Sequence, residues 1–467
     1  MTIKVIVIGN TGLCLECCKL IVDSSVYELL AVITNDLKLK QWGNEQKIKL
    51  LTYAEYQQSD YQHYVLLSII NERIISQALI KSHRIIHAIN YHDSLLPTYA
   101  GVNSTAWAIL NNESSHGVTW HKITQGIDEG DIIQQAKVAI TPEDTAHSLN
   151  LKCTQQAIVL FKKLLLELSS HTLNGKTQDL THKTYYGLDH LPQNYGFINT
   201  CQSLEDIDRY CRALYFVDDY PNQITSVKIK LENTVYLLGI PVFADAPQTL
   251  SDIIGLYIIA DAKALHFATV RNIYGMEVNL NTVVLTKELG LHKVEFSHHD
   301  WHQLKAIKKN EQKQINNALK IAYKANPIVS KATNNDDATK SATCDHSIEC
   351  QNLSTQQVVS AISLVLLRVA QQDEFLIHFY TNDNCPNHLA SLIDSKCFIE
   401  LSHNNLKLSL KNFKNLIGKS LNTKHLLAKD CYYRYHAMNL LTDVGIYHHG
   451  SITDLIHFTD YPTPHRL

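Results

Sequence analysis

The sequence predicts a protein of the α/β class, with a mainly parallel, doubly wound sheet in its first part. Two observations predict this class. Continuous apolar runs, such as residues 4–9, end at glycine or at polar residues, as buried parallel strands do. Over residues 1–180 these runs alternate with stretches of helical periodicity. Repeated β–α units imply a parallel sheet that helices cover on both faces.

The elements expected in this first part follow from apolar runs and turn residues. Strands are expected at residues 4–9, 28–34, 64–70, 84–90, 117–123 and 131–140, and helices at 11–23, 75–83 and 104–110. A long helix is expected after Thr141, with Pro142 in its first turn and Asp144 three positions past its cap. Its apolar stripe keeps helical spacing at Leu149, Cys153, Ala157, Leu160, Leu164 and Leu168.

The pattern changes near residue 186. A helix at 204–216 precedes paired strands at 227–231 and 234–238, then at 255–260 and 265–269, and a helix at 301–325 follows. We therefore expect a catalytic domain over 1–183 and a β-rich domain over 186–325. Residues 326–352 are polar and aperiodic, which predicts a linker. Residues 353–467 restart with a helix and a strand at 375–380, which predicts an α+β segment.

Composition limits the classes of function. The 467 residues include 42 Lys and Arg against 45 Asp and Glu, a net charge of -3, so a broad basic surface is excluded. No run of about 18 apolar residues is present, and the N-terminus does not resemble a signal peptide. The 11 cysteines are an odd number, which favours reduced thiols and a cytoplasmic location. Cys14 and Cys17 have no second pair at zinc-site spacing, so no metal is expected.

The residues that suggest chemistry follow the expected strand at 84–90. Asn90 and His92 are separated by one residue, so their side chains project the same way. The Asn90 amide is a neutral donor that can hold a developing oxyanion, and His92 can exchange a proton near neutral pH. Asp128, in a loop between Gly126 and Gly130, would tune the imidazole if it reaches the same crevice. Taken alone, however, Asn-x-His beside a strand is most often a satisfied turn.

The ensemble N-x-H-x-S-L-L-P, then Gly101, a strand and D-x-G-D-I resembles the folate-dependent formyltransferase family. That family includes methionyl-tRNA, glycinamide ribonucleotide and sugar-nucleotide formyltransferases, and formylation domains of nonribosomal peptide synthetases. The resemblance covers residues 1 to about 180 well and 186–325 more loosely. It implies a Rossmann-like N-terminal domain. It also places the family's catalytic trio on Asn90, His92 and Asp128.

The resemblance implies transfer of a formyl group from 10-formyltetrahydrofolate, the co-substrate, to a primary amine. In that reaction Asn90 and protonated His92 stabilise the oxygen of the attacked group. Asp128 keeps His92 charged and helps a water molecule move protons. No serine or cysteine nucleophile and no metal is implied.

A pterin pocket is also implied by the resemblance. Its wall is the backbone ahead of the Asn90 strand, at Asn71, Glu72, Arg73, Ile74 and Ile75. The loop from Gly126 to Asp128 closes the same pocket. Packing beneath the cofactor is expected from Ser94, Leu95, Leu96 and Pro97. For the isoleucines and leucines of this set, ordinary core packing explains the sequence equally well.

Three details resemble formylation domains of peptide-synthetase initiation modules, such as that of linear gramicidin synthetase. They are residues 99–107, residues 117–121 and the pair Asp128-Glu129. Residues 353–467 weakly resemble the condensation-like segment that precedes adenylation domains. The chain carries no adenylation loop, carrier serine motif or condensation H-H-x-x-x-D-G. The chain is therefore not a complete module. It either formylates an aminoacyl group on a separate carrier protein, which is the expected acceptor, or is a remnant, and no membrane partner is expected.

Other readings stay open. A tRNA-directed enzyme would need a basic second domain, yet Lys228, Lys230 and Arg271 alternate with acidic residues there. A sugar-nucleotide N-formyltransferase is as consistent with the sequence as the tRNA-directed enzyme. Outside enzymes, the chain could be a folate-binding docking protein with an inert core. The histidine pairs His298-His299 and His448-His449 fit no standard zinc spacing.

Overall fold

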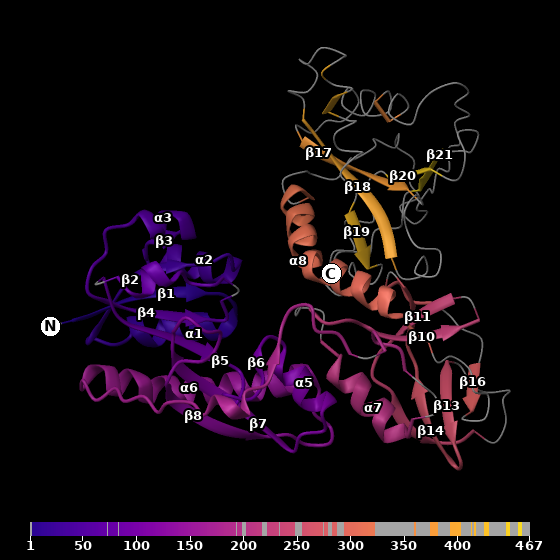
Figure 1. Cartoon of the computed structure of the whole chain (residues 1–467), viewed down its shortest axis with the longest axis horizontal. Coiled ribbons are helices and arrows are strands. Elements are labelled where there is room, and N and C mark those ends of the chain that lie inside the picture. Colours follow the sequence, from indigo (N-terminus) through magenta and orange to yellow (C-terminus); the bar gives the residue numbers. More distant parts are fainter. Residues whose placement is uncertain are drawn as a thin grey trace, which may run out of the picture. The chain divides into compact units, whose positions relative to one another are not determined.

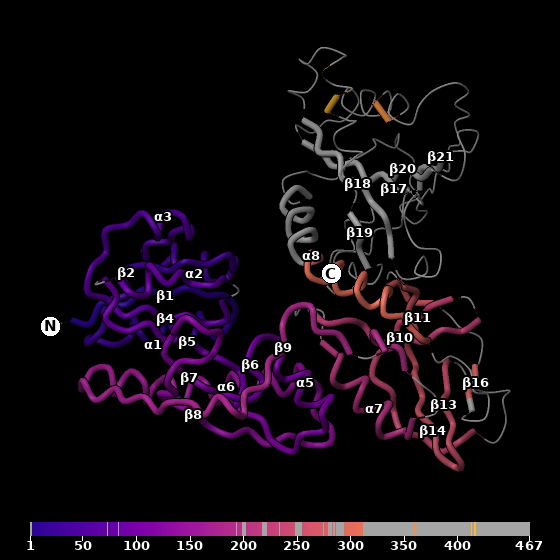
Figure 2. The backbone as a smooth tube through the Cα atoms, viewed as in Figure 1, coloured from indigo at the N-terminus to yellow at the C-terminus, as the bar shows by residue number. Residues whose placement is uncertain are grey.

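In this computed structural model the described residues are 2–322, apart from 72, 83, 193, 199–201, 217–221, 233, 248–254, 274, 279–282 and 287–293. Beyond them the structure describes 359–360, 374–381, 393–402, 412, 415–416, 425–428, 445–448 and 456–459. Of these, 359–360, 412 and 415–416 are coloured in Figure 2. Contacts divide the chain into two compact units. The N-terminal unit holds Met1–Leu188 with Arg212–Tyr215, and the C-terminal unit holds Asp189–Cys211 with Phe216–Leu467.

A seven-stranded sheet forms the centre of the N-terminal unit, in the order β3-β2-β1-β4-β5-β7-β8 (Figure 1). Its strands are β1 (Ile3–Gly9), β2 (Tyr27–Ile33), β3 (Leu50–Leu51), β4 (Tyr64–Ile69), β5 (Ile85–His92), β7 (Ser115–Lys122) and β8 (Ile132–Ala139). The first five run parallel, whereas β7 and β8 are antiparallel to their neighbours. The predicted mainly parallel α/β fold is therefore confirmed.

Helices cover both faces of this sheet. One face packs against α1 (Thr11–Val22) and α6 (Ala146–Ser169), and the other against α3 (Tyr53–Gln58) and α4 (Gln77–Ile80). Val5 and Val7 of β1 belong to the first core cluster, and Ile6 and Ile8 to the second. Both sides of the strand are thus buried, which explains why its sequence is apolar without alternation.

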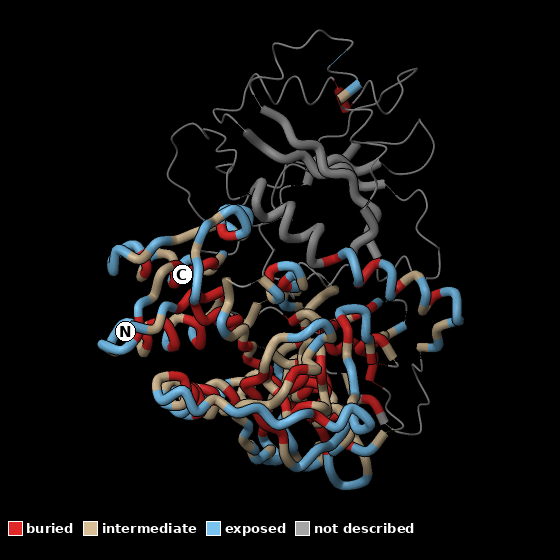
Figure 3. Tube along the Cα trace, turned by 60° about the vertical axis from the view of Figure 1, so that its left-hand side comes forward, coloured by how far each residue is buried: buried red, intermediate tan, exposed pale blue. Residues whose placement is uncertain are grey.

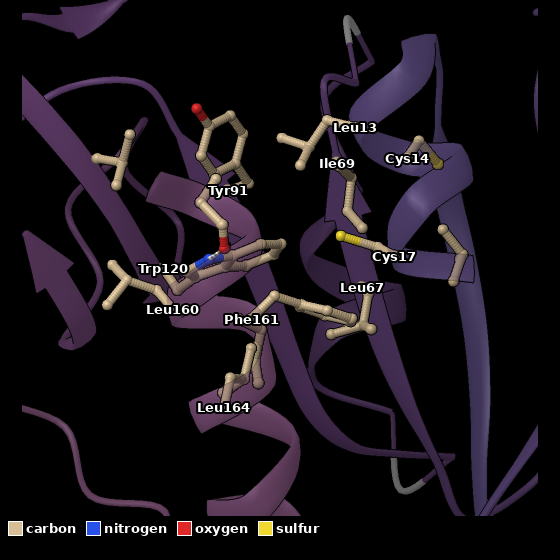
Figure 4. Packing of buried hydrophobic residues seen from close by; sticks show 14 of the residues in the cluster. Leu13, Cys14, Cys17, Leu67, Ile69, Tyr91, Trp120, Leu160, Phe161 and Leu164 are labelled. Atoms are coloured by element: carbon tan, nitrogen blue, oxygen red, sulfur yellow. Dashed lines mark hydrogen bonds between the residues drawn. The ribbon is translucent and has the colours of Figure 1, made fainter. Parts of the chain in front are cut away.

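The larger core cluster lies between the sheet and the helices α1 and α6 (Figure 4). Trp120 from β7 and Phe161 from α6 are fully buried, with ring centroids 5.1 Å apart. Cys14 and Cys17 of α1 point into the same cluster, and burial is the largest cause that raises the pKa of the Cys17 thiol. These cysteines are packing residues, because a buried neutral thiol is a poor nucleophile and a poor metal ligand.

Close approach of two strands fixes the glycine at the end of β1. A Cβ on Gly9 would lie 2.0 Å from the carbonyl oxygen of Ile69 on β4. Only glycine permits this contact, so Gly9 serves strand packing. The glycine at this first strand-to-helix turn is therefore explained by the packing of β1 against β4.

Several predicted boundaries are wrong. The long helix α6 starts at Ala146, because Thr145 caps it by accepting a hydrogen bond from Ser148 N at 3.0 Å, and Pro142 lies before the helix. The helix predicted at 75–83 is limited to the four residues of α4 in the structure. Just after its end, the Ser82 hydroxyl donates a hydrogen bond to the carbonyl oxygen of Leu79 at 2.6 Å. The helices α2 (Leu37–Glu45) and α3 and the short β3 were not predicted.

The remaining elements of the N-terminal unit are short. They are α5 (Ser104–Leu110), β6 (Ala100–Gly101), the 3-10 helix η1 (Leu180–His182) and β9 (Tyr185–Tyr186). The strands β6 and β9 pair in parallel as a separate two-stranded sheet. The predicted helix at 104–110 is confirmed by α5.

The C-terminal unit is rich in strands, as predicted. The hairpin β10 (Val227–Leu231) and β11 (Thr234–Leu238) pairs with β15 (Val270–Asn272). A second sheet has the order β12 (Val242–Asp245), β14 (Lys263–Phe267), β13 (Leu256–Ala260) and β16 (Val283–Thr286). The helix α7 (Leu204–Ala213) precedes them, and α8 (His298–Ala322) follows. Buried and exposed stretches alternate along the residues whose burial the structure describes, nearly all of them before residue 312 (Figure 3).

A five-stranded sheet lies in the last part of the chain. Its order is β19 (His425–Ala428), β18 (Ile393–Ser402), β17 (Glu374–Thr381), β20 (Gly445–His448) and β21 (Ile456–Thr459). The predicted strand at 375–380 is confirmed by β17. The predicted linker at 326–352 lies outside the described residues, and the domain boundaries stay a prediction. No helix among the described residues is long and apolar enough to cross a membrane.

Two leucines of α6 provide a test of this packing. Leu164 is 0% exposed and Leu166 is 70% exposed. Leu164→Ala should lower the free energy of unfolding by about 2–5 kcal/mol, because it leaves a cavity against the sheet. The matched control Leu166→Ala should change it by less than about 0.5 kcal/mol. Urea unfolding measures both, and equal losses would contradict this arrangement of the helix.

Candidate active site

Asn90 and His92 lie at the end of β5 and share one side of that strand. Between them, Tyr91 turns into the core, where its ring lies 5.3 Å from that of Trp120 (Figure 4). Alternation along the strand then directs Asn90 and His92 to the opposite side. The His92 side chain is 6% exposed. The predicted common orientation of this pair is therefore present.

Asp128 reaches the same place from the loop between β7 and β8. Its carboxylate accepts a hydrogen bond from Gly101 N at 2.9 Å, and Oδ2 lies 3.7 Å from His92 Nδ1. The residue has φ +57°, a left-handed conformation that residues with a Cβ seldom adopt. Its side chain is 10% exposed. The structure thus brings together the three side chains that the sequence suggested for catalysis.

The environment of Asp128 favours its charged form. Burial tends to raise the pKa of the carboxyl, but the charge of His92 and hydrogen bonds from His121 and from Gly101 N–H act in the opposite direction. Their sum holds the pKa of Asp128 well below its usual range. The site therefore contains a buried carboxylate that stays ionised at neutral pH.

The contacts of His92 define which ring nitrogen serves the site. Nε2 lies 2.8 Å from the carbonyl oxygen of Tyr99, which can only accept, so Nε2 carries a hydrogen. The other nitrogen, Nδ1, lies 3.7 Å from Asp128 Oδ2 and 3.9 Å from Asp93 Oδ1. Nδ1 is therefore the nitrogen that takes up or releases a proton, and it does so beside carboxylates.

The sequence interpretation assigned no role to His121, which joins the same cluster. It lies opposite Asn90 in the antiparallel pair β5–β7, and its Nε2 is 3.2 Å from Asn90 Nδ2 and 3.5 Å from Asp128 Oδ1. Its Nδ1 donates to the carbonyl oxygen of Lys122 at 2.8 Å. Nε2 thus lies between the Asn90 amide and the Asp128 carboxylate: without a hydrogen it accepts from Asn90 Nδ2, and with one it donates to Asp128. The sequence held one signal for His121. Because side chains alternate along a strand, the residue after the core residue Trp120 faces away from the core.

This arrangement suits direct attack by an external nucleophile on a carbonyl carbon. Asn90 supplies an amide N–H, His92 a titratable nitrogen and Asp128 a fixed negative charge. The neighbouring Ser94 is fully buried, and its hydroxyl donates to the carbonyl oxygen of Thr98 at 2.7 Å. Ser94 therefore has a structural role and does not offer a nucleophile to the site.

The predicted pterin-contact residues separate into exposed and buried ones. Ile74 is 81% exposed, whereas Ile75 is 7% exposed and belongs to a core cluster. Arg73 is exposed, and its guanidinium lies 5.5 Å from the Tyr53 ring centroid. Two hydrogen bonds of the Asn71 side chain hold this turn. Its Oδ1 accepts from Arg73 N at 3.0 Å, and its Nδ2 donates to Arg73 O at 2.9 Å. Glu72 lies outside the described residues.

The residues predicted to lie beneath the cofactor are mainly internal. Leu96 is 3% exposed, and its bond to Pro97 is cis. Leu95 packs against Gly117, where a Cβ would lie 2.4 Å from the leucine side chain. Gly126 lies against the Glu129 side chain in the Asp128 loop. Their contact with a cofactor stays a prediction. No cluster of three His, Cys, Asp or Glu residues that could hold a metal is found in the part of the chain that the structure describes.

Comparisons with known proteins point to one family. Residues 31–165 match the family model described as formyl transferase. GDP-perosamine N-formyltransferase of Brucella melitensis biotype 1 is 34% identical over 149 residues, which are 32% of this chain and 54% of that protein. Methionyl-tRNA formyltransferase of Lachnospira eligens is 30% identical over 143 residues, which are 31% of this chain and 44% of that protein.

Among solved structures, an N-formyltransferase from Helicobacter canadensis, in complex with folinic acid and dTDP-3-aminofucose, is similar with a TM-score of 0.45. The identity is 22%, and the similarity covers 60% of this chain and 99% of that chain. The chain spans about half the length of the curated relatives it matches. The family match and the relatives support a formyltransferase domain around residues 31–165.

The charge of Asp128 predicts a pH-dependent contribution to stability. Its folded pKa lies below the unfolded value of about 3.9, so the stabilisation is complete above that value and is lost as the pH falls below it. Asp128→Asn should therefore be less stable than the unsubstituted chain at neutral pH. The difference should shrink as the pH falls below about 4.

Urea unfolding at several pH values measures this difference. Asp131→Asn is the control, because the side chain of Asp131 is 34% exposed and pairs with Lys122 at 3.0 Å on the surface. It should change the stability less than Asp128→Asn. A loss for Asp128→Asn that is independent of pH would contradict the assigned charge.

Proposed function

We propose that the N-terminal unit transfers a formyl group from 10-formyltetrahydrofolate to a primary amine. The observation that carries the proposal is the meeting of Asn90, His92 and Asp128 at the end of β5. His92 Nδ1 lies 3.7 Å from the Asp128 carboxylate, and Asn90 and Asp128 share the neighbour His121. The formyl transferase match over residues 31–165 supports the same chemistry and includes all four residues.

The chemistry asks the site to stabilise a carbonyl oxygen while an amine attacks its carbon. Asn90 Nδ2 has two hydrogens, and with one directed to His121 the other is available to that oxygen. A proton on His92 Nδ1 stabilises the same developing negative charge. Asp128 lies on the side of Nδ1, so its negative charge faces the nitrogen that carries this proton.

As the amine nitrogen bonds to the formyl carbon, the bond from that carbon to N10 of the folate breaks, and one proton passes from the amine to N10. The site has groups that can move this proton. His92 Nδ1 is a proton carrier in contact with Asp128 and near Asp93. The low exposure of His92, at 6%, strengthens these electrostatic interactions relative to those in water. Asp128 remains a carboxylate throughout, so it acts through charge and through orientation of the ring.

We propose that the exposed turn ahead of β5 contacts the flat heterocycle of the folate. Ile74 leaves a large apolar side chain 81% exposed, and the Asn71 contacts hold the turn that presents it. 10-Formyltetrahydrofolate supplies the formyl group when bound. Arg73 and Ile74 are the residues that we propose to contact it, together with the Gly126–Asp128 loop. The proposed folate pocket would be supported from behind by residues that are buried or packed internally, namely Ile75, Ser94, Leu95 and Leu96.

For the acceptor, we propose an aminoacyl group on a separate carrier protein, as in nonribosomal peptide initiation. The support is the resemblance of residues 99–107 and 117–121 to formylation domains of that class. A sugar nucleotide is the second candidate, because a GDP-perosamine N-formyltransferase is 34% identical over 149 residues. Methionyl-tRNA is a third, supported by the methionyl-tRNA formyltransferase at 30% identity over 143 residues.

Substitution of the two β5 residues tests the chemistry. Asn90→Ala and His92→Ala should each lower the turnover number by at least about a hundredfold, because each removes a group that stabilises developing charge. The melting temperature should change little. Formylation is followed by mass spectrometry of the acceptor. The control is His87→Asn, since His87 lies on β5 but alternation places it on the opposite side from His92. Unchanged rates for both alanine variants would remove these residues from the chemistry.

The acceptor is identified by offering each candidate amine to the purified chain with 10-formyltetrahydrofolate. We expect the mass of the aminoacyl carrier to increase by one carbonyl group. A nucleotide sugar that is formylated and also raises the melting temperature would favour the second candidate instead. Steeply salt-dependent tRNA binding with formylation of its aminoacyl group would favour the third. Folate binding without turnover on any of these amines would indicate an inert docking protein.

A further inference from the structure

We propose that residues 176–186, called here the strap, position His92 and Asp128 for catalysis by holding the two loops that contact them. This inference rests on the proposed function and adds positioning residues to it. The strap follows α6 and includes η1 and β9. The strap bonds to the two loops through Gln178, Lys183 and Thr184, and these hydrogen bonds do not go to His92 or to the Asp128 carboxylate itself. It acts through the backbone of both loops.

The first loop is the one that carries Asp128. Gln178 Nε2 donates to the carbonyl oxygens of Asp128, at 2.9 Å, and Gly130, at 2.6 Å. Lys183 Nζ donates to the carbonyl oxygen of Ile127 at 2.9 Å and pairs with Glu129 Oε1 at 2.7 Å. The left-handed backbone of Asp128 needs such support, because an isolated residue with a Cβ rarely keeps it.

The second loop contains Tyr99 and Gly101, whose backbone groups contact His92 and Asp128. Tyr99 N donates to Thr184 Oγ1 at 2.7 Å, and Ala100 N donates to Thr184 O at 2.9 Å. The N–H of Ala100 and the carbonyl of Tyr99 belong to one planar trans peptide and point in opposite directions. Thr184 therefore directs the Tyr99 carbonyl oxygen toward His92 Nε2, which lies 2.8 Å away.

The end of the strap fixes the orientation of Gly101. Val102 N donates to Tyr186 O at 2.9 Å, and Gly101 has φ +104°. A Cβ on Gly101 would lie 2.1 Å from Tyr186 O, so the strap requires glycine at this position. The Gly101 N–H then donates to Asp128. The Tyr186 ring also stacks between Tyr99, at 5.6 Å, and Trp107, at 4.6 Å.

Three substitutions in the strap separate positioning from folding. Thr184→Val keeps the shape of the side chain but removes the acceptor for Tyr99 N, whereas Thr184→Ser restores it. Gln178→Met removes the donor to the Asp128 loop with little change in length. The matched control is Thr181→Val, because the Thr181 hydroxyl bonds only to Asp179 within the strap.

The first readout is hydrogen exchange of the unliganded full chain by mass spectrometry. We expect faster exchange in residues 98–102 for Thr184→Val and in residues 126–131 for Gln178→Met. Residues 64–69 of β4 should exchange as before, and Thr184→Ser and Thr181→Val should resemble the unsubstituted chain. Equal exchange in residues 98–102 of the valine and serine variants at Thr184 would overturn the proposal, as would unchanged exchange in residues 126–131 of Gln178→Met.

The second readout is the kinetics of formyl transfer. Thr184→Val and Gln178→Met should each lower kcat by about tenfold or more, with the KM for the folate within about twofold, because they misplace the reacting groups. Unchanged kcat in both, while Asn90→Ala is inactive, would overturn the strap and leave the proposed function intact. Full activity of Asn90→Ala would overturn the proposed chemistry, and the strap would then be judged by hydrogen exchange alone.

Discussion

A buried, ionised carboxylate is the constraint on which the rest of the site depends. Asp128 is 10% exposed and accepts from Gly101 N–H at 2.9 Å, and both His92 and His121 lie within 4 Å of it. A charge in such a place is stable only when donors and cations surround it. The two histidines, the left-handed loop and the glycine at position 101 are all arranged around this charge, so the site forms as a unit.

The change from parallel to antiparallel pairing in the sheet makes this cluster possible. β5 pairs with β4 in parallel but with β7 in antiparallel, and that second pairing places His121 opposite Asn90. The β7–β8 connection then returns Asp128 to the end of β5, where the parallel part of the sheet also ends. Tyr91 and Trp120 fill the opposite face as core residues. The core therefore fixes the register that aligns the polar side chains.

The parallel strands and the common orientation of Asn90 and His92 could be predicted, because both follow from local apolar runs and from alternation. His121 could not be assigned, since its role depends on the register between β5 and β7. The helices α2 and α3 are short, with 9 and 6 residues, and were missed, although the capping box of Thr52 and Glu55 was readable. Ile74 and Ile75 look equivalent in sequence. The turn that Asn71 holds by hydrogen bonds is what leaves Ile74 exposed and Ile75 buried.

Acceptor choice is separable from the chemistry of the site. Two relatives named for different acceptors, GDP-perosamine and methionyl-tRNA, match this chain over similar lengths of 149 and 143 residues. The family match at residues 31–165 contains Asn90, His92, His121 and Asp128. In the proposed formyl transfer, a segment that resembles enzymes named for different acceptors would supply the common step, because specificity arises from differences in affinity between substrates. For that proposed reaction, the residues that select the amine are to be sought outside the shared chemistry, and a change of acceptor would leave the charge balance around Asp128 intact.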